Sequence, residues 1–396
     1  MIYFIYVLKM GGSVLTDPDQ IKKTISTIQK IVSEGKNVVV VVSALKGETN
    51  KLDDIANKLH IEDKADRAEI ISMGERVSAR IMVGALKANG IDAILVDPQD
   101  DLWPVHSFGD YLNADVDIEK TKEDVQKKLF PLIKNGKIPV VCGFIGINEE
   151  KKIQTLGRGG SDTTAVVLGN ALNAREVVLF KDVGIAFSGD PKKAQNVKAL
   201  DELDIDEALA LSAGGSGLIH YKAFKYLNTV LRVTSLDAGL SSGTIVNPTN
   251  GIGVSITAKD VSMITIIPEY DSSELLEKVT SVINSIGSQI YGLFIGSKAI
   301  LLYVSEKPDL YQKVHENLVN SGGAKAISVM PSLTEITVKS FDLEATPGYL
   351  SMVVSPLAEK GINIYGVITA TSSIKVYVSS NSAEEALNLI RQKVEV

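Results

Sequence analysis

Two patterns of apolar and polar residues divide the chain near residue 250. Before this point, short runs that are almost wholly apolar alternate with longer segments whose apolar residues recur at helical spacing, such as residues 19–35, which end at a glycine. Continuous apolar runs are typical of parallel strands covered on both faces. This part therefore predicts a three-layer αβα fold with a mainly parallel sheet. Its expected strands are residues 1–8, 38–45, 92–97, 137–146 and 176–183.

After a turn-rich stretch at residues 247–253, short strands and helices of ferredoxin-like α+β type are expected. This tail repeats itself: residues 263–267 resemble 335–339, and four residues of a later strand recur after 74 positions, namely Ile300, Tyr303, Val304 and Ser305 as Ile374, Tyr377, Val378 and Ser379. The repeat predicts two tandem domains, although chance similarity between strand patterns is the alternative. The expected domains are residues 1–250, 258–328 and 332–396, with a C-terminal strand able to pack with the first copy.

The composition and charge of the chain argue against several classes of function. The 396 residues are 45% hydrophobic, as in a soluble globular protein, and their net charge of −7 argues against nucleic acid as a main partner. The first apolar segment is too short to span a membrane and lacks the basic flank of a signal peptide, which predicts a cytoplasmic protein. The single cysteine, Cys142, excludes an internal disulfide and is expected to be a buried, inert thiol. Four scattered histidines predict no zinc cluster and no dedicated metal site.

The stretch TLGRGGSDTTAVVLGNAL, residues 155–172, carries the clearest chemistry. It lacks the lysine of a P-loop, but Arg158 precedes two glycines, and Ser161 and Asp162 are expected to cap a helix that starts near Thr163. An arginine can grip a carboxylate while an aspartate takes an ammonium group, so the stretch suits a zwitterion. A capped surface turn is the alternative, although it leaves the two glycines beside an arginine unexplained.

A second motif, LKMGGS at residues 8–13, follows the first predicted strand. It places Lys9 at the strand end, where the Gly11 and Gly12 amides can hold phosphate oxygens. A lysine in that position can neutralise charge on a transferring phosphoryl group. The alternative is a tight turn with a lysine that extends to solvent. Residues 41–52 and 72–80 add hydroxyl and carboxylate groups after a strand or early in a helix.

Together, these motifs resemble those of the aspartate kinases of the amino acid kinase superfamily. LKMGGS, VVSALKGETNKL, SMGERVSAR, GFIG, TLGRGGSDTTA and FKDVGIAFSGDP occur in that family's order, and the tail resembles its pair of ACT domains. The resemblance implies transfer of the ATP γ-phosphoryl group to the β-carboxylate of L-aspartate, giving 4-phospho-L-aspartate, the first step towards lysine, threonine and methionine. It also implies Mg²⁺ bound with the nucleotide.

The resemblance assigns roles residue by residue. Lys9 and Asp162 would be catalytic. The residues around aspartate would be Ser43, Thr49, Glu75, Phe144, Arg158, Ser161 and Asp162, with Arg158 on the α-carboxylate and Glu75 and Asp162 near the amino group. The residues around ATP would be Lys9, Gly11, Gly12, Ser13, Lys181, Asp182, Phe187, Asp190, Pro191 and Lys192.

The nucleotide side departs from the family. Where members usually have TDVDGVYTADPR, residues 181–192 are KDVGIAFSGDPK, and Gly217 stands where a lysine that contacts ATP is expected. Lys181, Lys192 and Lys222 are the candidates to compensate, and Lys181 is favoured because it ends a strand; His220 is expected to pack or to start a helix. The alternative function is a catalytically weak paralogue that senses amino acids or regulates a partner kinase. A kinase for another acidic amino acid or for carbamate shares the fold but leaves the paired tail domains unexplained.

The tail implies regulation. ACT domains generally bind amino acids between paired copies, so the resemblance implies a lysine or threonine effector and a homodimer through the tail. The second copy has the expected Pro347–Gly348 before its first helix, whereas the first copy offers Ser272 or Ser273 as a cap. A tail that serves only for dimerisation is the alternative.

Overall fold

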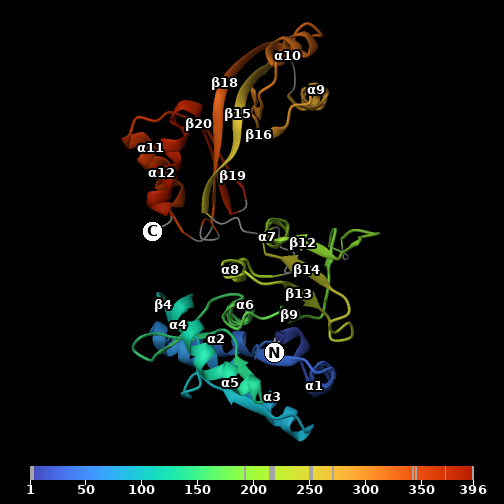
Figure 1. Ribbon diagram of the computed structural model, residues 1–396, viewed down its shortest axis with the longest axis vertical. Helices are drawn as coiled ribbons and strands as arrows, with labels where there is room; N and C mark the ends of the chain where they lie inside the picture. The colour runs from blue at the N-terminus through green and yellow to red at the C-terminus, as the bar shows by residue number, and fades with distance from the viewer. Residues whose placement is uncertain are drawn as a thin grey trace. The chain divides into compact units, whose positions relative to one another are not determined.

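The computed structural model describes residues 4–190, 193–213, 219–248, 253–269, 272–340, 343, 346–370 and 372–394. The chain divides into two compact units, Met1–Asn250 and Gly251–Val396. Figure 1 traces the elements of both units from the N-terminus to the C-terminus. Among the described helices, none has the length and apolar character needed to cross a membrane.

The first unit is built on an eight-stranded sheet in the order β12-β14-β13-β9-β1-β2-β6-β3. All neighbouring pairs are parallel except β13 and β14, so the prediction of a mainly parallel sheet is confirmed. The central strands are apolar throughout because both faces of the sheet are covered. The strands are β1 (Ile5–Met10), β2 (Asn37–Val42), β3 (Ala93–Val96), β6 (Ile138–Cys142), β9 (Glu176–Phe180), β12 (Glu202–Asp204), β13 (Leu231–Thr234) and β14 (Thr244–Asn247).

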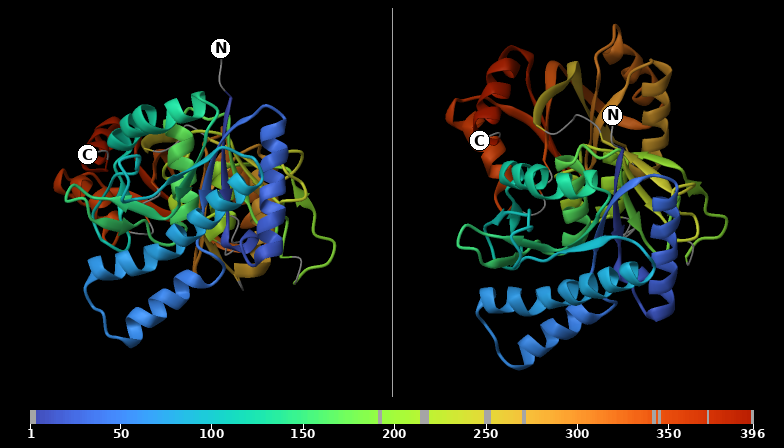
Figure 2. Two further views of the ribbon diagram at one scale, coloured as in Figure 1. Left: turned by 90° about the horizontal axis from the view of Figure 1, so that it is seen from below. Right: turned by 60° about the horizontal axis from the view of Figure 1, so that its bottom comes forward.

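Helices cover both faces of this sheet, which completes the three layers. In Figure 2, α1 (Pro18–Ser33) and α6 (Gly160–Ala171) lie on opposite sides of the central strands. The other helices are α2 (Glu48–Lys58), α3 (Lys64–Ala88), α4 (Ile118–Asp124), α5 (Phe130–Lys134), α7 (Ile205–Ala213) and α8 (Tyr221–Phe224), with a π-helical turn at Val125–Leu129. Three short hairpins extend from the unit: β4 (Ser107–Phe108) with β5 (Asp115–Val116), β7 (Ile145–Ile147) with β8 (Ile153–Thr155), and β10 (Ala186–Phe187) with β11 (Ala199–Leu200).

Two sequence-based details need correction. The apolar run 137–146 forms two strands, because the chain turns at Gly143–Phe144 between β6 and β7. Ser161 and Asp162 do not cap α6, which begins earlier than expected, at Gly160, after Gly159 in a left-handed conformation with φ 73°. The two side chains therefore lie in the first turn of the helix. Cys142 is fully buried, and burial raises the pKa of its thiol, as expected for an inert cysteine.

The second unit is one six-stranded antiparallel sheet in the order β16-β17-β15-β18-β20-β19. Helices pack on each half of it, which confirms the ferredoxin-like α+β expectation. Helix α11 begins directly after Pro347–Gly348, whereas the side chains of Ser272 and Ser273 lie outside the described part. The elements are β15 (Gly253–Pro268), α9 (Ser272–Ser285), β16 (Ile290–Ile295), β17 (Ile300–Ser305), α10 (Leu310–Leu318), β18 (Ala324–Lys339), α11 (Tyr349–Glu359), β19 (Ile364–Ala370), β20 (Ser373–Ser379) and α12 (Ala383–Val394).

Strands β15 and β18 are long enough to serve two hydrophobic cores. The first core contains Ile264 and Ile266 from the second half of β15, and the other core contains Val254 from its first half. The strand that completes the second copy therefore starts before the expected boundary at residue 258. No C-terminal strand is found among the described residues, where α12 is the last element. The repeated tyrosines Tyr303 and Tyr377 stack between the cores, with ring centroids 3.8 Å apart.

Candidate active site

A cleft of about 690 Å³ opens at the carboxyl ends of the parallel strands in the first unit. Such edges are where open α/β sheets bind ligands. All seven residues expected around aspartate line this cleft, together with Lys9, Gly12 and Ser13 from the expected phosphate turn. The seven come from four separate parts of the chain, namely Ser43 and Thr49, Glu75, Phe144, and Arg158, Ser161 and Asp162.

Glycines bring the walls of the cleft close together. A Cβ on Gly12 would lie 3.2 Å from the Ala44 carbonyl oxygen, and one on Gly143 would lie 2.8 Å from Ser161 Cβ. Gly11 donates its N–H to the Phe180 carbonyl oxygen at 3.3 Å, which ties the end of β1 to the end of β9. The two glycines of the LKMGGS turn are thus required by packing as well as by any ligand.

A buried row of alternating charges borders the cleft, and two of its members, Lys9 and Asp162, line it. Lys9 Nζ lies 2.7 Å from Asp162 Oδ1, and Lys181 Nζ lies 3.6 Å from Asp162 Oδ2. Burial by itself raises the pKa of Asp162, but the charges of Lys181 and Lys9 outweigh it and lower the pKa to about 2. Burial lowers the pKa of Lys181, against the opposing effect of Asp162. One carboxylate thus holds two ammonium groups beside a cleft, a net positive charge suited to an anion.

Glu75 of α3 lines the cleft and has a buried carboxylate. Its Oε1 accepts a hydrogen bond from the Ala44 N–H at 3.0 Å, whereas Oε2 is buried without a hydrogen-bond partner among the described residues. Burial raises the pKa of Glu75 to about 7, although the Ala44 N–H and the Lys9 charge oppose the shift. An unpaired buried carboxylate oxygen is costly unless a ligand pairs with it, so Glu75 is a candidate to receive a cation.

The raised pKa predicts how stability depends on pH. Because folded Glu75 binds its proton more tightly than unfolded Glu75, the free energy of unfolding should fall as pH rises from about 4.5 to about 7 and then level off. The contribution of this group is at most about 3 kcal/mol. Glu75→Gln should remove this part of the slope, measured by chemical denaturation across pH 5–8 without ligands. The exposed Glu123→Gln should keep the wild-type slope, and equal slopes for both variants would contradict the prediction.

Phe144 and Arg158 shape the entrance. Phe144 adopts φ 72°, a left-handed conformation that is strained for a residue with a side chain, and its N–H donates to Thr164 Oγ1 at 3.0 Å. Arg158 is exposed at the rim of the cleft and has no ion-pair partner among the described residues. A guanidinium in this position is available to a carboxylate that enters the cleft.

Fewer of the residues expected around ATP line the cleft than of those expected around aspartate. The Asp182 N–H donates to Ser13 Oγ at 3.3 Å, which joins the segment after β9 to the phosphate turn. Phe187 lies in the β10–β11 hairpin, and Asp190 Oδ2 lies 3.6 Å from Lys193 Nζ. Neither of these two lines the cleft. Pro191, Lys192 and Gly217 lie outside the described residues.

Two of the lysines that could replace the one expected at the position of Gly217 make different contacts. Lys181 reaches Asp162 in the cleft, whereas Lys222 Nζ donates to the Ala114 carbonyl oxygen at 2.7 Å and to Asn113 Oδ1 at 2.9 Å. Lys222 is buried and holds a loop in place. His220 is the N-cap of α8, where its Nδ1 accepts from the Lys222 N–H, so its expected role at a helix start is confirmed.

Sequence reasoning left out several residues that line the cleft, among them Lys46 and Leu112. Lys46 follows β2 within the motif 41–52, so its place after a strand end was a usable signal. Leu112 lies in the β4–β5 loop, and no sequence pattern connects that loop with the cleft. Within the described ranges, no group of three or more His, Cys, Asp or Glu side chains is arranged to hold a metal ion.

Fold and cleft together define a class of protein. Residues 5–234 match the amino acid kinase family. This match covers more than half of the chain, and the chain therefore belongs to the amino acid kinase family.

Within that family, the chain is similar to aspartokinases. It is 26% identical over 409 aligned positions to the aspartokinase of Bacillus sp. (strain MGA3), covering 98% of this chain and 97% of the relative. Its fold matches the aspartate kinase of Synechocystis with a TM-score of 0.80 at 23% identity, over 99% of this chain and 69% of that one. It also matches E. coli aspartokinase III, solved with aspartate and ADP, with a TM-score of 0.54 at 21% identity, over 99% and 100% of the two chains.

Proposed function

We propose that this chain is an aspartate kinase, which transfers the γ-phosphoryl group of ATP to the β-carboxylate of L-aspartate. The observation that carries the proposal is the ion-paired row Lys9–Asp162–Lys181, because Lys9 and Asp162 line the same cleft as Glu75 and Arg158. The row supplies positive charge for a phosphoryl group, and the other two residues can hold the two ends of an amino acid. The near full-length similarity to an aspartokinase supports this choice of acceptor.

The proposed acceptor site binds aspartate by its α-groups. Arg158 pairs with the α-carboxylate at the rim, and Glu75 Oε2 accepts a hydrogen bond from the ammonium group. Ser43, Thr49, Ser161 and Phe144 complete the walls. The β-carboxylate then points towards the lysine row. It is already ionised at neutral pH, so positioning replaces general-base catalysis.

The proposed transfer breaks the bond between the γ-phosphorus and the oxygen that bridges it to the β-phosphate. A new bond forms between that phosphorus and a β-carboxylate oxygen, and ADP leaves with the bridging oxygen. Negative charge spreads over the γ-phosphoryl oxygens during the step, where Lys9, Lys181 and the Gly12 amide can stabilise it; the Gly11 N–H is already bonded to the Phe180 carbonyl oxygen. Asp162 fixes both lysines and so keeps the two positive charges together.

We propose that Mg²⁺ enters with ATP. The ion prefers oxygen ligands and keeps several of its waters, so phosphate oxygens can supply most of its coordination. Asp182, whose N–H contacts Ser13, offers a carboxylate on that side.

The direct test traps the acyl phosphate. Purified protein with ATP, Mg²⁺ and hydroxylamine should form a hydroxamate with aspartate, and little or none with glutamate or without an amino acid. Equal product from glutamate would contradict the assignment of aspartate. Absence of product, combined with a thermal shift by amino acids, would favour the catalytically weak sensor instead.

We further propose that the tail comprises two ACT domains that bind lysine or threonine and pair two chains into a homodimer. The internal repeat and the two cores that share β15 and β18 support this. Inhibition of hydroxamate formation by lysine, threonine or methionine would test it. If none of the three amino acids inhibits hydroxamate formation, dimerisation remains as the role of the tail.

A further inference from the structure

Arg158, the residue proposed to bind the α-carboxylate of aspartate, lies in a segment with little stiffness of its own. Gly157 and Gly159 flank it, and both adopt a left-handed conformation with φ 73°. Glycine leaves the backbone more conformations than any other residue, so ordering residues 157–159 costs more entropy than ordering an average segment. An arginine that became ordered only on binding would hold its ligand more weakly. The segment therefore depends on contacts from elsewhere in the fold.

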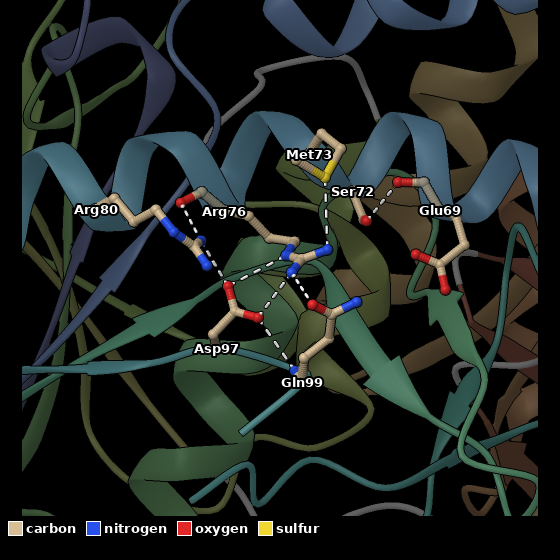
Figure 3. Close-up of polar contacts among 7 residues, drawn as sticks. All are labelled: Glu69, Ser72, Met73, Arg76, Arg80, Asp97 and Gln99. Atoms are coloured by element: carbon tan, nitrogen blue, oxygen red, sulfur yellow. Dashed lines mark hydrogen bonds and ion pairs between the residues drawn. The ribbon is translucent and has the colours of Figure 1, made fainter. Parts of the chain in front are cut away.

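Glu75, at the other end of the proposed aspartate site, is held by its own helix. Its neighbour Arg76 donates from Nε and Nη2 to the two oxygens of the buried Asp97 at 3.1 and 3.0 Å. Arg80 Nη1 lies 2.6 Å from the same carboxylate, as Figure 3 shows. A long helix that two arginines anchor to a strand end is a rigid support for Glu75. The support of Arg158 has to come from a different element.

Two side chains contact the Arg158 segment, one on each side. A Cβ on Gly157 would lie 2.2 Å from Asn113 Oδ1, and a Cβ on Gly159 would lie 2.1 Å from His220 Cβ. The two glycine backbones thus lie directly against these side chains, and a larger residue at either position would displace them. Burial lowers the pKa of His220, so its ring is neutral at neutral pH and does not repel the Arg158 guanidinium.

Helix α8 supports both of these contacts. His220 is its N-cap, and Lys222 lies in its first turn. Lys222 Nζ donates to Asn113 Oδ1 at 2.9 Å and to the Ala114 carbonyl oxygen at 2.7 Å. Because Lys222 is only 8% exposed, water hardly competes for these bonds. The Asn113 oxygen that Lys222 binds is the same atom that faces Gly157, so this bond fixes the side chain that contacts the Arg158 segment.

We propose, on the basis of the proposed aspartate kinase function, that Lys222 is a positioning residue for aspartate. Through Asn113 it holds the Arg158 segment against His220, so that the guanidinium is in place before the substrate arrives. Lys222 is not among the described residues that line the cleft. It therefore acts through the loop that contains Asn113, and not by touching aspartate or ATP.

Kinetics at varied aspartate test this role. Lys222→Met removes both bonds while filling most of the same space, so KM for aspartate should rise about tenfold, with kcat at saturating aspartate and KM for ATP within about twofold of wild type. Lys128→Met is the matched control, because Lys128 Nζ also donates to a backbone carbonyl oxygen, that of Trp103, at 2.8 Å. The control should lower the melting temperature but leave KM for aspartate close to wild type. Equal changes of this KM in both variants would overturn the proposal.

A double-mutant cycle separates positioning from a general loss of stability. In an Arg158→Ala background, Lys222→Met should lower kcat/KM for aspartate by less than about twofold further, because its effect passes through the missing guanidinium. A destabilising change without a link to Arg158 would lower kcat/KM by the same factor in both backgrounds. That additive result would refute the positioning role.

Tryptic cleavage after Arg158 gives a readout that does not depend on kinase activity. Lys222→Met should be cut at this site several-fold faster than wild type and Lys128→Met, with similar rates at other sites. Equal rates at Arg158 in all three proteins would show that Lys222 does not hold the segment. Absence of hydroxamate from wild type would contradict the proposed kinase function. A wild type that forms the hydroxamate, with an unchanged KM for aspartate in Lys222→Met, would contradict the positioning role alone.

Discussion

Replacing Lys9 by methionine is expected to lower kcat by about 100- to 1000-fold, the usual effect of removing one preorganised charge from a transition state. The Lys9 side chain is only 8% exposed and lies 2.7 Å from Asp162, so neither water nor another side chain can take its place easily. Methionine fills the same space without the charge. Steady-state rates of hydroxamate formation measure the effect.

The matched control for Lys9 is Lys46→Met, which changes an exposed lysine of the same cleft. Because solvent screens Lys46, its loss should cost less than about tenfold in kcat. Thermal unfolding should show that both variants fold, since Asp162 keeps Lys181 as a partner. A Lys9→Met enzyme with kcat within twofold of wild type would refute the proposed role.

Replacing Lys181 by methionine is expected to lower kcat by about 100-fold and to raise KM for ATP. The resemblance to aspartate kinases implies a phosphate lysine at the position of Gly217, and Lys181 is the described candidate that pairs with a residue of the cleft, Asp162. Its ammonium group and that of Lys9 lie on the two oxygens of one carboxylate, so both can act on the same phosphoryl group. Kinetics at varied ATP separate the change in kcat from the change in KM.

Two further variants make the Lys181 prediction specific. Lys181→Arg keeps the charge and should retain more activity than Lys181→Met. Lys222→Met should lower the melting temperature, because Lys222 holds the Ala114 carbonyl oxygen, but should leave kcat per folded enzyme close to wild type. If Lys181→Met leaves kcat and KM for ATP unchanged, Lys181 does not replace the lysine expected at the position of Gly217. If only Lys222→Met lowers kcat, Lys222 takes that role instead.

Much of the fold could be predicted because local patterns report local burial. Apolar runs predicted β2, β3, β6 and β9. Four residues that recur after 74 positions, with Tyr303 matching Tyr377, indicated the equivalent strands β17 and β20 of the tail. Most residues of the proposed acceptor site could be expected to meet for a related reason: they lie close after strands, and parallel strands end at one edge. Glu75 is the exception, because it lies in the middle of α3.

Other features depend on contacts that no local pattern records. Ser161 and Asp162 look like helix caps, yet Gly159 takes the cap position and Asp162 turns to Lys9 instead. Similarly, β15 looks like the start of one tail domain, but its first half completes the core of the other. In both cases a long-range partner outweighs the local preference.

The sequence by itself determined the main parallel strands and their alternation with helices, and that Lys9 and Lys181 stand near the end of a strand and Asp162 near the start of a helix. Only the tertiary structure decided that these three residues meet, because the strand order β9-β1-β2 sets the end of β1 between its neighbours and under α6. The tertiary structure also decided that α3 exposes Met73, Val77 and Ile81, because Arg76 and Arg80 of this helix pair with Asp97. The periodicity of a segment says how much of it is buried, whereas the choice of partner depends on how all the segments pack together.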